Sequence, residues 1–428
     1  MMRATKDSGF EWIGIIPTEW ALSKIGQVYR LRNTKVSDTD YPPLSVTNKG
    51  IVPQLDTAAK TNAHDDRKLV KKDDFAINSR SDRRGSCGIS DFDGSVSLIN
   101  TILAPLNEMN PGYYDWLFHT VQFGDEFYKF GHGIVDDLWT TGWQEMKKIT
   151  IPTPPLPEQQ RIADFLDAKC AEIDALTADI QTQINTLEQY KRSVITETVT
   201  KGLNPATEMK DSGIDGAGVT PSHWKTTKLC YECYIRARLG WRGLKADEYV
   251  DEGYAFISAF NIQNGKLVWT PLNYITKERF DESPEIKLHS GDVLIVKDGA
   301  GVGKCARVDD LPMGGTAPNS SIAVITPSKN LDYRYVCYYL QSAVFNNFVL
   351  LLYNGMGVPH LTQEVMSKIK ILVPPLKEQM VISDYLDAKC TEIDAVVETK
   401  KSQLATLDEY KKSLIFEYVT GKKEVPLS

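Results

Sequence analysis

The chain contains one 22-residue segment twice, and this duplication limits the folds that it can adopt. The copies run from Pro154 to Ala175 (PPLPEQQRIADFLDAKCAEIDA) and from Pro374 to Ala395 (PPLKEQMVISDYLDAKCTEIDA), and 16 of the 22 positions are identical. A shorter motif is also duplicated, as DSGFEWIGIIPTEW at 7–20 and DSGIDGAGVTPSHW at 211–224. The offset is 204 residues at the short motif and 220 at the long one, so the second middle section holds about 16 extra residues. The chain is therefore predicted to consist of two units with the same order of parts.

Each long copy begins a segment that is typical of a coiled-coil helix. Its prolines lie where an extended segment or a first helical turn tolerates them, and no Pro or Gly then occurs from Glu158 to Lys201. Apolar residues recur every seven positions, which predicts helices of about 40 residues, roughly 60 Å long, with a hydrophobic seam. The predicted seam residues are Leu166, Ile173, Ile180, Leu187 and Val194 in the first copy and Leu386, Ile393, Leu407 and Leu414 in the second, where Lys400 interrupts the row. A second, partly filled row is predicted three positions further on: Ile162, Leu176, Tyr190, Ile382, Val396 and Tyr410.

An apolar seam of this length cannot stay exposed to water, so each helix needs a partner. The matched lengths favour pairing of the two segments within one chain. Two helices in separate globular cores, or a homodimeric coil, are the alternatives. Cys170 and Cys390 hold matching places on the apolar stripes and are predicted to pack in the core.

The two middle sections differ in sequence but share landmarks. The runs DDFAINSR (73–80) and GDVLIVKD (291–298) are short and apolar between turn-forming residues, which predicts buried strands. Helices are predicted to follow from Tyr113 and from Tyr333. The matching landmarks are Cys87 and Cys305, Gly85 and Gly303, and Tyr113 and Tyr333. We therefore predict α+β domains, each with a twisted sheet.

Composition and charge exclude several classes of protein. An apolar content of 42% and a charged content of 25% are those of an ordinary soluble globular chain. The densest apolar run, FNNFVLLLY at 345–353, is half the length of a membrane span. The first residues, MMRATKDSGFEW, lack the apolar core of a signal peptide. A cytoplasmic protein is expected, in keeping with seven sparse Cys.

Positive charge gathers near the front of each unit although the chain carries a net charge of −7. Residues 21–90 contain 13 Lys and Arg against 8 Asp and Glu, and residues 225–246 contain 6 against 1. Such local surpluses can attract a polyanion that the net charge would repel.

No motif in the chain predicts catalysis or a metal centre. KDGAGVGKCARV (297–308) resembles a phosphate-binding loop, but Asp298 replaces its first Gly and Cys305 replaces its hydroxyl residue. The residues after Cys305 are typical of a strand and a turn and not of the helix that such a loop requires. Cys230 and Cys233 form a lone CxxC without the two further ligands that zinc needs. We therefore predict no catalytic residue and no metal ligand.

Basic and amide-rich loops remain as candidate DNA-binding sites. Arg forms two hydrogen bonds with guanine, Asn and Gln do so with adenine, and Lys contacts phosphate. The loops SVTNKG (45–50) and SAFNIQNG (258–265) are predicted to correspond between the two units. The candidates are Asn48, Lys49, Arg80, Arg83, Arg84, Arg236, Arg238, Arg242, Lys245, Asn261, Lys297 and Lys304.

The whole plan resembles the specificity subunit of type I restriction-modification systems. The resemblance rests on the duplicated PPLPEQQRIADFLDAK and PPLKEQMVISDYLDAK segments, the paired DSG motifs and the two unlike sections between them. It implies two target recognition domains, Ala21–Ile149 and Lys225–Ile371, each for one half of a split DNA site. It also implies that the two long helices pair antiparallel, set the spacing of the half-sites and dock partner subunits. One departure is Gly216, which stands where the first DSG motif has Trp12.

The resemblance further implies a domain order and a set of partners. The expected parts are 1–152 (motif and first recognition domain), 153–204 (spacer helix), 205–372 (second recognition domain) and 373–428 (second spacer helix). The expected partners are double-stranded DNA, two modification subunits that bind S-adenosylmethionine, and restriction subunits that use ATP and Mg²⁺. This chain would itself be non-catalytic. A coiled-coil scaffold and a nucleotide-dependent DNA enzyme are the alternative functions.

Overall fold

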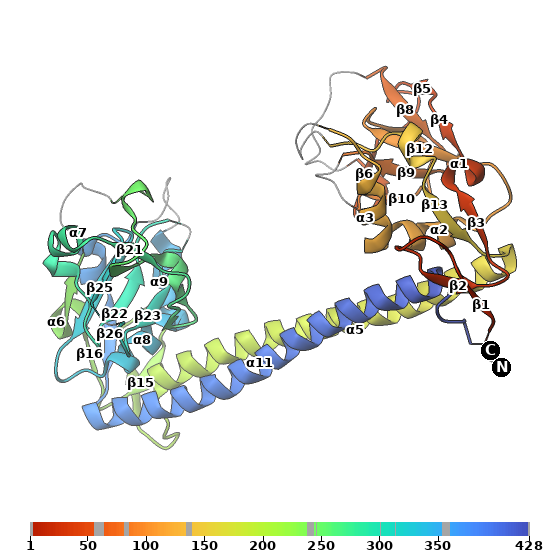
Figure 1. Cartoon of the computed structure of the whole chain (residues 1–428). Helices are drawn as coiled ribbons and strands as arrows, with labels where there is room; N and C mark the ends of the chain where they lie inside the picture. The colour runs from red at the N-terminus through yellow and green to blue at the C-terminus, as the bar shows by residue number, and fades with distance from the viewer. Residues whose placement is uncertain are drawn as a thin grey trace. The chain divides into compact units, whose positions relative to one another are not determined.

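The computed structural model divides the chain into two compact units, each described here by itself (Figure 1). Unit 1 comprises Met1–Gln181 together with Ser402–Ser428, and unit 2 comprises Thr182–Lys401. The first and last residues of the chain thus belong to the same unit. The structure describes residues 3–54, 64–80, 85–133, 139–237, 244, 246–299, 301–312, 314–352 and 360–426.

Unit 1 is an α+β unit built on a four-stranded antiparallel sheet of order β10-β9-β12-β4. A three-stranded sheet (β11-β8-β5), the hairpin β6–β7 and the pairs β1–β2 and β3–β13 complete its strands. The strands are β1 Thr5–Asp7, β2 Ile15–Pro17, β3 Ala21–Lys24, β4 Tyr29–Arg32, β5 Lys35–Val36, β6 Leu44–Thr47, β7 Gly50–Pro53, β8 Arg67–Val70, β9 Phe75–Asn78, β10 Cys87–Ile89, β11 Gly94–Val96, β12 Asn100–Pro105 and β13 Thr150–Thr153. The short helices are α1 Ile25–Val28, α2 Pro111–Phe118, α3 Val121–Lys129 and α4 Trp143–Met146.

Unit 2 repeats this plan, with a sheet of order β23-β22-β25-β17 in place of β10-β9-β12-β4. Its three-stranded sheet is β21-β18-β24, and its hairpin is β19–β20. The strands are β14 Met209–Asp211, β15 Val219–Pro221, β16 Lys225–Lys228, β17 Cys233–Arg236, β18 Tyr254–Ile257, β19 Ile262–Gln263, β20 Lys266–Leu267, β21 Asn273–Ile275, β22 Val293–Val296, β23 Cys305–Arg307, β24 Thr316–Pro318, β25 Ile322–Pro327 and β26 Lys370–Val373. The short helices are α6 Leu229–Glu232, η3 Ala246–Glu248, η4 Ala259–Asn261, α7 Lys277–Asp281, η5 Pro284–Ile286, α8 Tyr333–Gln341, α9 Ala343–Leu352 and α10 Gln363–Ser367.

Most of the sequence landmarks hold. The two predicted strands form β9 and β22, and all four residues of β22 are buried because the strand has neighbours on both sides and is covered on both faces. Cys87 and Cys305 each begin the edge strand of the four-stranded sheet. Gly85 and Gly303 both adopt positive φ, at 73° and 88°, in the turn before that strand. The α+β prediction is confirmed for both units.

One landmark is wrong: the equivalent of Tyr113 is Tyr335 and not Tyr333. Each lies three residues after the N-cap residue of its helix, Asn110 in α2 and Asp332 in α8. The cap, and not the first tyrosine of the run, determines which side chain points into the core. Both tyrosines are fully buried. Their hydroxyls donate to backbone carbonyls at the ends of the long helices, that of Tyr113 to Val419 at 2.8 Å and that of Tyr335 to Val199 at 3.2 Å.

The two long helices form as predicted, as α5 (Leu156–Lys201) and α11 (Leu376–Val419), and they pair antiparallel. In unit 1 the ring of Phe165 packs on Tyr418, with centroids 4.5 Å apart, and Lys411 donates to Asp174 at 2.6 Å. In unit 2 Lys400 donates to Gln183, and Lys191 donates to Asp394 at 2.6 Å. Residue numbers rise along one helix as they fall along the other. Pairing within one chain is thereby confirmed in each unit.

The seam contains the first predicted row, whereas only Ile162 and Ile382 of the second predicted row are buried. Leu166, Ile173, Ile180, Leu386, Ile393 and Leu414 are buried, and Leu187, Val194 and Leu407 are half-buried. In the predicted second row, Leu176, Tyr190, Val396 and Tyr410 are exposed to between 42% and 53%. The actual second row lies four residues after the first and includes Cys170, Ile184, Cys390 and Val397. Rows at three and at four residues lie on opposite sides of the first row, and the direction of the partner helix selects between them.

The two predicted cysteines are part of this seam. Cys170 and Cys390 are 2% and 6% exposed. Burial raises the pKa of the Cys170 thiol to about 11, so the thiol remains neutral at physiological pH. Their predicted role in core packing is confirmed.

Replacing Ile173 with Asp should strongly destabilise unit 1, because the new carboxylate would be buried in an apolar seam without a partner. The expected cost is several kcal/mol, seen as a lower midpoint in urea unfolding. Leu176→Asp is the matched control, since this residue lies three positions away on the same helix and is 47% exposed. It should shift the midpoint little. Equal effects of the two substitutions would contradict the seam described above.

Candidate nucleic-acid interface

In unit 1 the hairpin β6–β7 presents the predicted residues Asn48 and Lys49 to solvent. The Thr47 hydroxyl holds the turn by donating to the Gly50 carbonyl at 2.9 Å and accepting from the Lys49 amide at 3.1 Å. The hairpin lies directly on strand β10, where a Cβ on Gly88 would come within 2.8 Å of the Gly50 backbone. Close backbone packing therefore positions an amide and an ammonium group at an exposed turn.

Unit 2 carries the equivalent hairpin, β19–β20. Its Gly265 bridges Ala306 of β23, one residue after Cys305, just as Gly50 lies on Gly88, one residue after Cys87. The predicted correspondence of the two loops is therefore confirmed, because Gly50 and Gly265 contact equivalent positions of the edge strand. The exposed residues of this turn are Gln263, Asn264 and Lys266, which sequence reasoning missed. The Asn-Gly pair at 264–265 was the available signal, since both residues adopt positive φ, as such hairpin turns require.

Asn261 belongs to the interior and not to this exposed set, which corrects its prediction as a DNA-binding residue. It is 4% exposed. Its amide nitrogen donates to the carbonyls of Val268 and Pro271, at 2.9 and 3.0 Å, and its amide oxygen accepts from the Ser258 backbone at 3.0 Å. The side chain holds the loop from inside, because a buried amide must be paired there.

Arg236 is also corrected, from a DNA-binding residue to a structural one. Its side chain is 8% exposed and donates to Asp292 at 2.7 Å, and the Asp292 side chain is fully buried. Unit 1 has the same pair, Arg32 with Asp74, at the same places on β4 and before β9. A buried guanidinium that pairs with a buried carboxylate links the strands of the sheet and is not presented to DNA. The repetition of this pair in both units was the signal that could have identified it.

Lys304 and Lys297 differ in how far their ammonium groups are exposed to a ligand. Lys304 is exposed in the turn before β23. Lys297 is mostly buried and donates to Asp298 at 2.7 Å, and burial lowers the pKa of its ammonium group. Because residues 305–307 are a strand and not a helix, the phosphate-loop interpretation is rejected, as predicted. Of the two lysines, Lys304 is the better placed to meet a ligand.

In unit 1 Arg80 follows β9 and is half-buried, with its backbone bridged to Thr140. It lines a cavity of about 240 Å³ together with the turn before β10 and the residues around α3. The remaining predicted residues lie outside the part of the chain that the structure describes: Arg83, Arg84, Arg238, Arg242 and Lys245.

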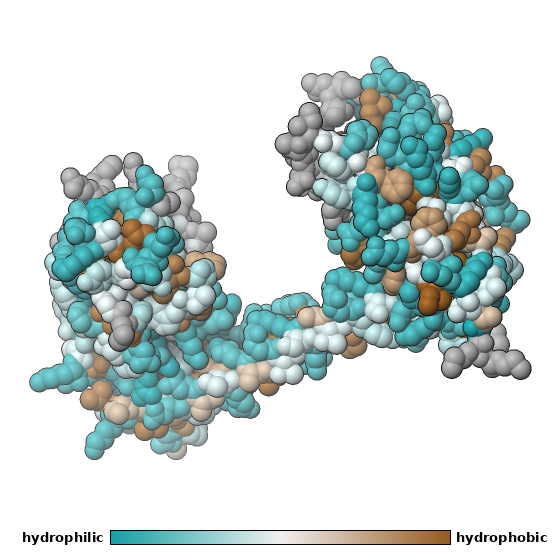
Figure 2. All heavy atoms as spheres, viewed as in Figure 1, coloured by the Kyte–Doolittle hydropathy of each residue, from teal (hydrophilic) through white to brown (hydrophobic). Residues whose placement is uncertain are grey.

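A groove of about 1110 Å³ gathers the exposed candidates of unit 2. The β19–β20 turn and Lys304 form one side, and the unit 2 parts of α5 and α11 form the other. Hydrophilic residues cover much of the visible surface of this unit (Figure 2). The charged lining residues are Lys191, Arg192, Lys266, Lys304 and Lys401 against Glu188, Asp394 and Glu398. The groove therefore offers amides and a small surplus of positive charge, which suits a nucleic acid.

Across the described residues, no group of three or more His, Cys, Asp or Glu is placed to hold a metal ion. Within the same residues no single helix is long and apolar enough to cross a membrane, and the bent pair α8–α9 meets that test only when its helices are taken together.

A family model matches most of the chain. It describes the type I restriction modification DNA specificity domain and matches residues 17–186 and 240–406. Among curated proteins, the MjaVIII type I specificity subunit of Methanocaldococcus jannaschii is 26% identical over 343 residues, which cover 78% of this chain and 76% of that protein. The EcoKI specificity subunit of Escherichia coli is 24% identical over 210 residues, 48% of this chain and 44% of that one.

Solved structures share the fold. A chain from a study of complex assembly and conformational transition in the type I R-M system has a TM-score of 0.73 at 17% identity, covering 95% of this chain and 99% of that one. The HsdS subunit from Thermoanaerobacter tengcongensis has a TM-score of 0.52 at 18% identity, covering 97% and 100%. At these identities the likeness supports the fold alone.

Replacing Arg236 with Ala should unfold unit 2 more easily instead of removing a DNA contact. The change removes the guanidinium partner of the buried Asp292 carboxylate and leaves it only the Thr326 hydroxyl and the His289 amide, and breaking a buried ion pair costs about 3–5 kcal/mol in comparable cases. Lys304→Ala, at an exposed cation, should cost less than about 0.5 kcal/mol. Urea unfolding of both variants measures the difference. The double variant Arg236→Met, Asp292→Asn should recover part of the loss; stability equal to the parent in Arg236→Ala would refute the structural assignment.

Proposed function

The chain belongs to the type I restriction modification DNA specificity family, and we propose that its two units read the two halves of one asymmetric DNA site. The observation that carries this proposal is the pair of equivalent hairpins with unlike turn residues. Asn48 and Lys49 occupy one, and Gln263, Asn264 and Lys266 occupy the other. Two hairpins with the same backbone position but different exposed side chains would contact DNA in the same manner and recognise different base sequences.

The chemistry of the exposed residues supports a division into base and phosphate contacts. Asn and Gln side chains can form paired hydrogen bonds with adenine, and exposed ammonium groups can neutralise phosphates. We assign base reading to Asn48, Gln263 and Asn264, and phosphate contact to Lys49 and Lys304. Arg80, together with Arg83, Arg84, Arg238, Arg242 and Lys245, remains a predicted part of the interface.

The long helices are proposed to dock the partner subunits. Identical side chains of the duplicated segment remain exposed where packing does not require them, as in the ion pairs Lys169–Glu172 and Lys389–Glu392, at 2.8 and 2.9 Å. Two equivalent docking surfaces would suit two modification subunits.

The chemistry of the complex would then reside in its other subunits. This chain is the non-catalytic specificity component, in line with relatives that are named specificity subunits. We propose that the modification subunits bind S-adenosylmethionine and that the restriction subunits use ATP and Mg²⁺. Since its substrate would be cellular DNA, we place the complex in the cytoplasm. The four-part division at 152, 204 and 372 remains a proposal, because both long helices contribute residues to both compact units.

Replacing Lys49 or Lys304 with Ala should weaken binding to every DNA sequence. A lost phosphate contact lowers the slope of log affinity against log salt by about one unit. Titration of cognate and scrambled duplexes at three salt concentrations measures that slope. Lys412→Ala, at another exposed cation on α11, is the control and should change nothing. Unchanged slopes in both test variants would remove these lysines from the interface.

Exchanging residues 225–371 for the equivalent section of a relative should change one half of the methylated site and leave the other half intact. The reason is that β16 and β26 pair with each other, so the two ends of this section meet in one sheet. Mapping N6-methyladenine in a host that expresses the complex tests the expectation. The reciprocal exchange of residues 21–149 is the control and should alter only the other half. Changes in both halves after either exchange would refute independent reading.

A further inference from the structure

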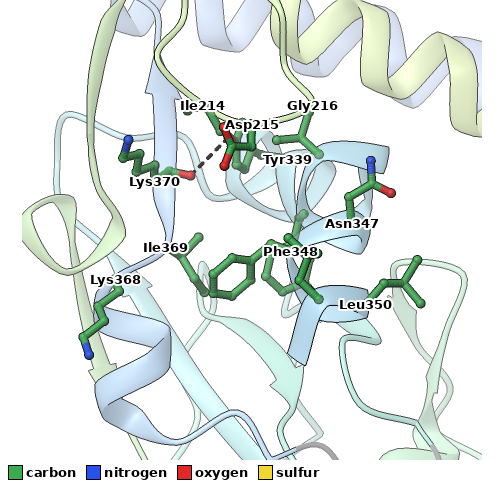
Figure 3. Close-up of a pocket in the computed structure, with 13 residues that line it drawn as sticks. Ile214, Asp215, Gly216, Tyr339, Asn347, Phe348, Leu350, Lys368, Ile369 and Lys370 are labelled. Atoms are coloured by element: carbon green, nitrogen blue, oxygen red, sulfur yellow. Dashed lines mark hydrogen bonds between the residues drawn. The ribbon is translucent and has the colours of Figure 1, made fainter. Parts of the chain in front are cut away.

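Unit 2 has a mainly apolar pocket of about 610 Å³ (Figure 3), which shares Leu350 with the groove beside the proposed DNA-reading turns. It lies between the loop that follows β14, helix α9 and the residues that lead into β26. Its walls include Ile214, Tyr339, Phe345, Phe348 and Ile369. The Tyr339 hydroxyl is already paired, donating to the Lys370 carbonyl at 3.1 Å. The pocket thus presents mainly carbon atoms to whatever enters it.

One wall of this pocket is the place where the second DSG motif has Gly216 instead of a tryptophan. The loop that carries this motif is closed by the same backbone hydrogen bond in both units. The Ser8 amide donates to the Gly14 carbonyl at 3.0 Å, and the Ser212 amide donates to the Gly218 carbonyl at 3.0 Å. Within these equivalent loops, Trp12 and Gly216 occupy the same position.

The opposite wall is also equivalent in the two units. Thr120 caps α3 and bonds the Phe123 amide, and Ser342 caps α9 and bonds the Phe345 amide in the same way. Phe123 and Phe345 are therefore matching residues, and both are buried to about 1% exposure.

In unit 1 the indole ring of Trp12 fills the space between the loop of the DSG motif and Phe123. Trp12 is only 8% exposed, and its ring meets the edge of Phe123 with centroids 6.1 Å apart. In unit 2 the matching Phe345 is among the residues that line the pocket, and its ring is already covered, with Phe348 beside it at 6.2 Å between centroids. Among the described residues, a Cβ on Gly216 would meet only the Asn347 side chain, at 3.4 Å. The position that Trp12 fills in unit 1 thus carries no side chain in unit 2.

The rim of the pocket is mixed, because exposed Asp215, Asn347, Lys368 and Lys370 stand there beside two leucines. Leu350 and Leu351 of α9 are 60% and 64% exposed. Large aliphatic side chains on a soluble surface next to an apolar hollow mark a contact surface for another polypeptide. Tryptophan is among the residues enriched at the centre of such contacts, because its ring buries a large area at one point.

We propose that this pocket binds a tryptophan side chain presented by a partner polypeptide, at unit 2 only. The indole of the partner would make an intermolecular contact in unit 2 where Trp12 makes an intramolecular contact in unit 1. A partner of this kind would bind one copy per chain and would distinguish the two units, whereas docking on the duplicated helices would treat them alike. The proposal therefore goes beyond the reading of DNA and does not depend on it.

The test uses the full-length chain and N-acetyltryptophanamide, which carries the indole as a peptide does. Saturation-transfer NMR should detect binding of this probe and no binding of N-acetylalaninamide. Phe348→Asp in the wall and Leu351→Asp at the rim should each weaken binding at least tenfold. Val121→Asp, at a 54% exposed residue of α3 in unit 1, should leave binding unchanged. Since Leu351 is exposed, its variant should fold even if Phe348→Asp does not.

A second variant tests the equivalence of the units. Trp12→Ala should open the matching pocket in unit 1, so that the number of probe sites rises from one to two. Absence of probe binding to the parent, or binding that neither Phe348→Asp nor Leu351→Asp weakens, would overturn the proposal. Binding of free indole without binding of N-acetyltryptophanamide would also overturn it, because the pocket would then take a small molecule and not a side chain. A stoichiometry of one in a folded Trp12→Ala variant would refute the equivalence on which the proposal rests.

Discussion

The apolar seam between α5 and α11 is the constraint on which both units depend. Each unit contains the first part of one long helix and the last part of the other. The last residues of each helix are then tied to the unit by a buried tyrosine hydroxyl, Tyr113 to the Val419 carbonyl and Tyr335 to the Val199 carbonyl. If the helices did not pair, unit 1 would lose its C-terminal segment and unit 2 would lose the end of α5.

The two units share the interactions that hold their sheets together and differ in the side chains that they expose. The ion pairs Arg32–Asp74 and Arg236–Asp292, each with a buried carboxylate, link the same two strands in each four-stranded sheet. The hairpins next to these sheets share a glycine contact with the edge strand but differ in their exposed residues. A buried pair tolerates few substitutions, since one unpaired partner is costly, whereas an exposed turn residue can change freely. The same frame can thus carry two different recognition surfaces.

The equivalence of the units is nevertheless incomplete. Trp12 packs its ring on Phe123 in unit 1, while unit 2 has Gly216 at the matching position, beside a pocket that Phe345 also lines. One substitution of this size removes an entire ring from an apolar contact. A molecule that meets both units would therefore find two different surfaces on an otherwise repeated structure.

The sequence alone was enough to predict the two-unit plan, the long paired helices, the buried strands β9 and β22 and the family. The units, helices and strands follow from repeats, heptads and apolar runs, which are local and periodic signals, whereas the family was predicted from a resemblance to a known one. Only the tertiary structure decided the second row of the seam, because apolar Leu176 and Tyr190 compete with Cys170 and Ile184 until a partner helix has a direction. It also decided that Arg236 and Asn261 are internal and that Gln263, Asn264 and Lys266 are exposed. Whether an Arg or Asn side chain faces a buried carboxylate or water depends on residues far away in the chain, such as Asp292, and no local pattern records that contact.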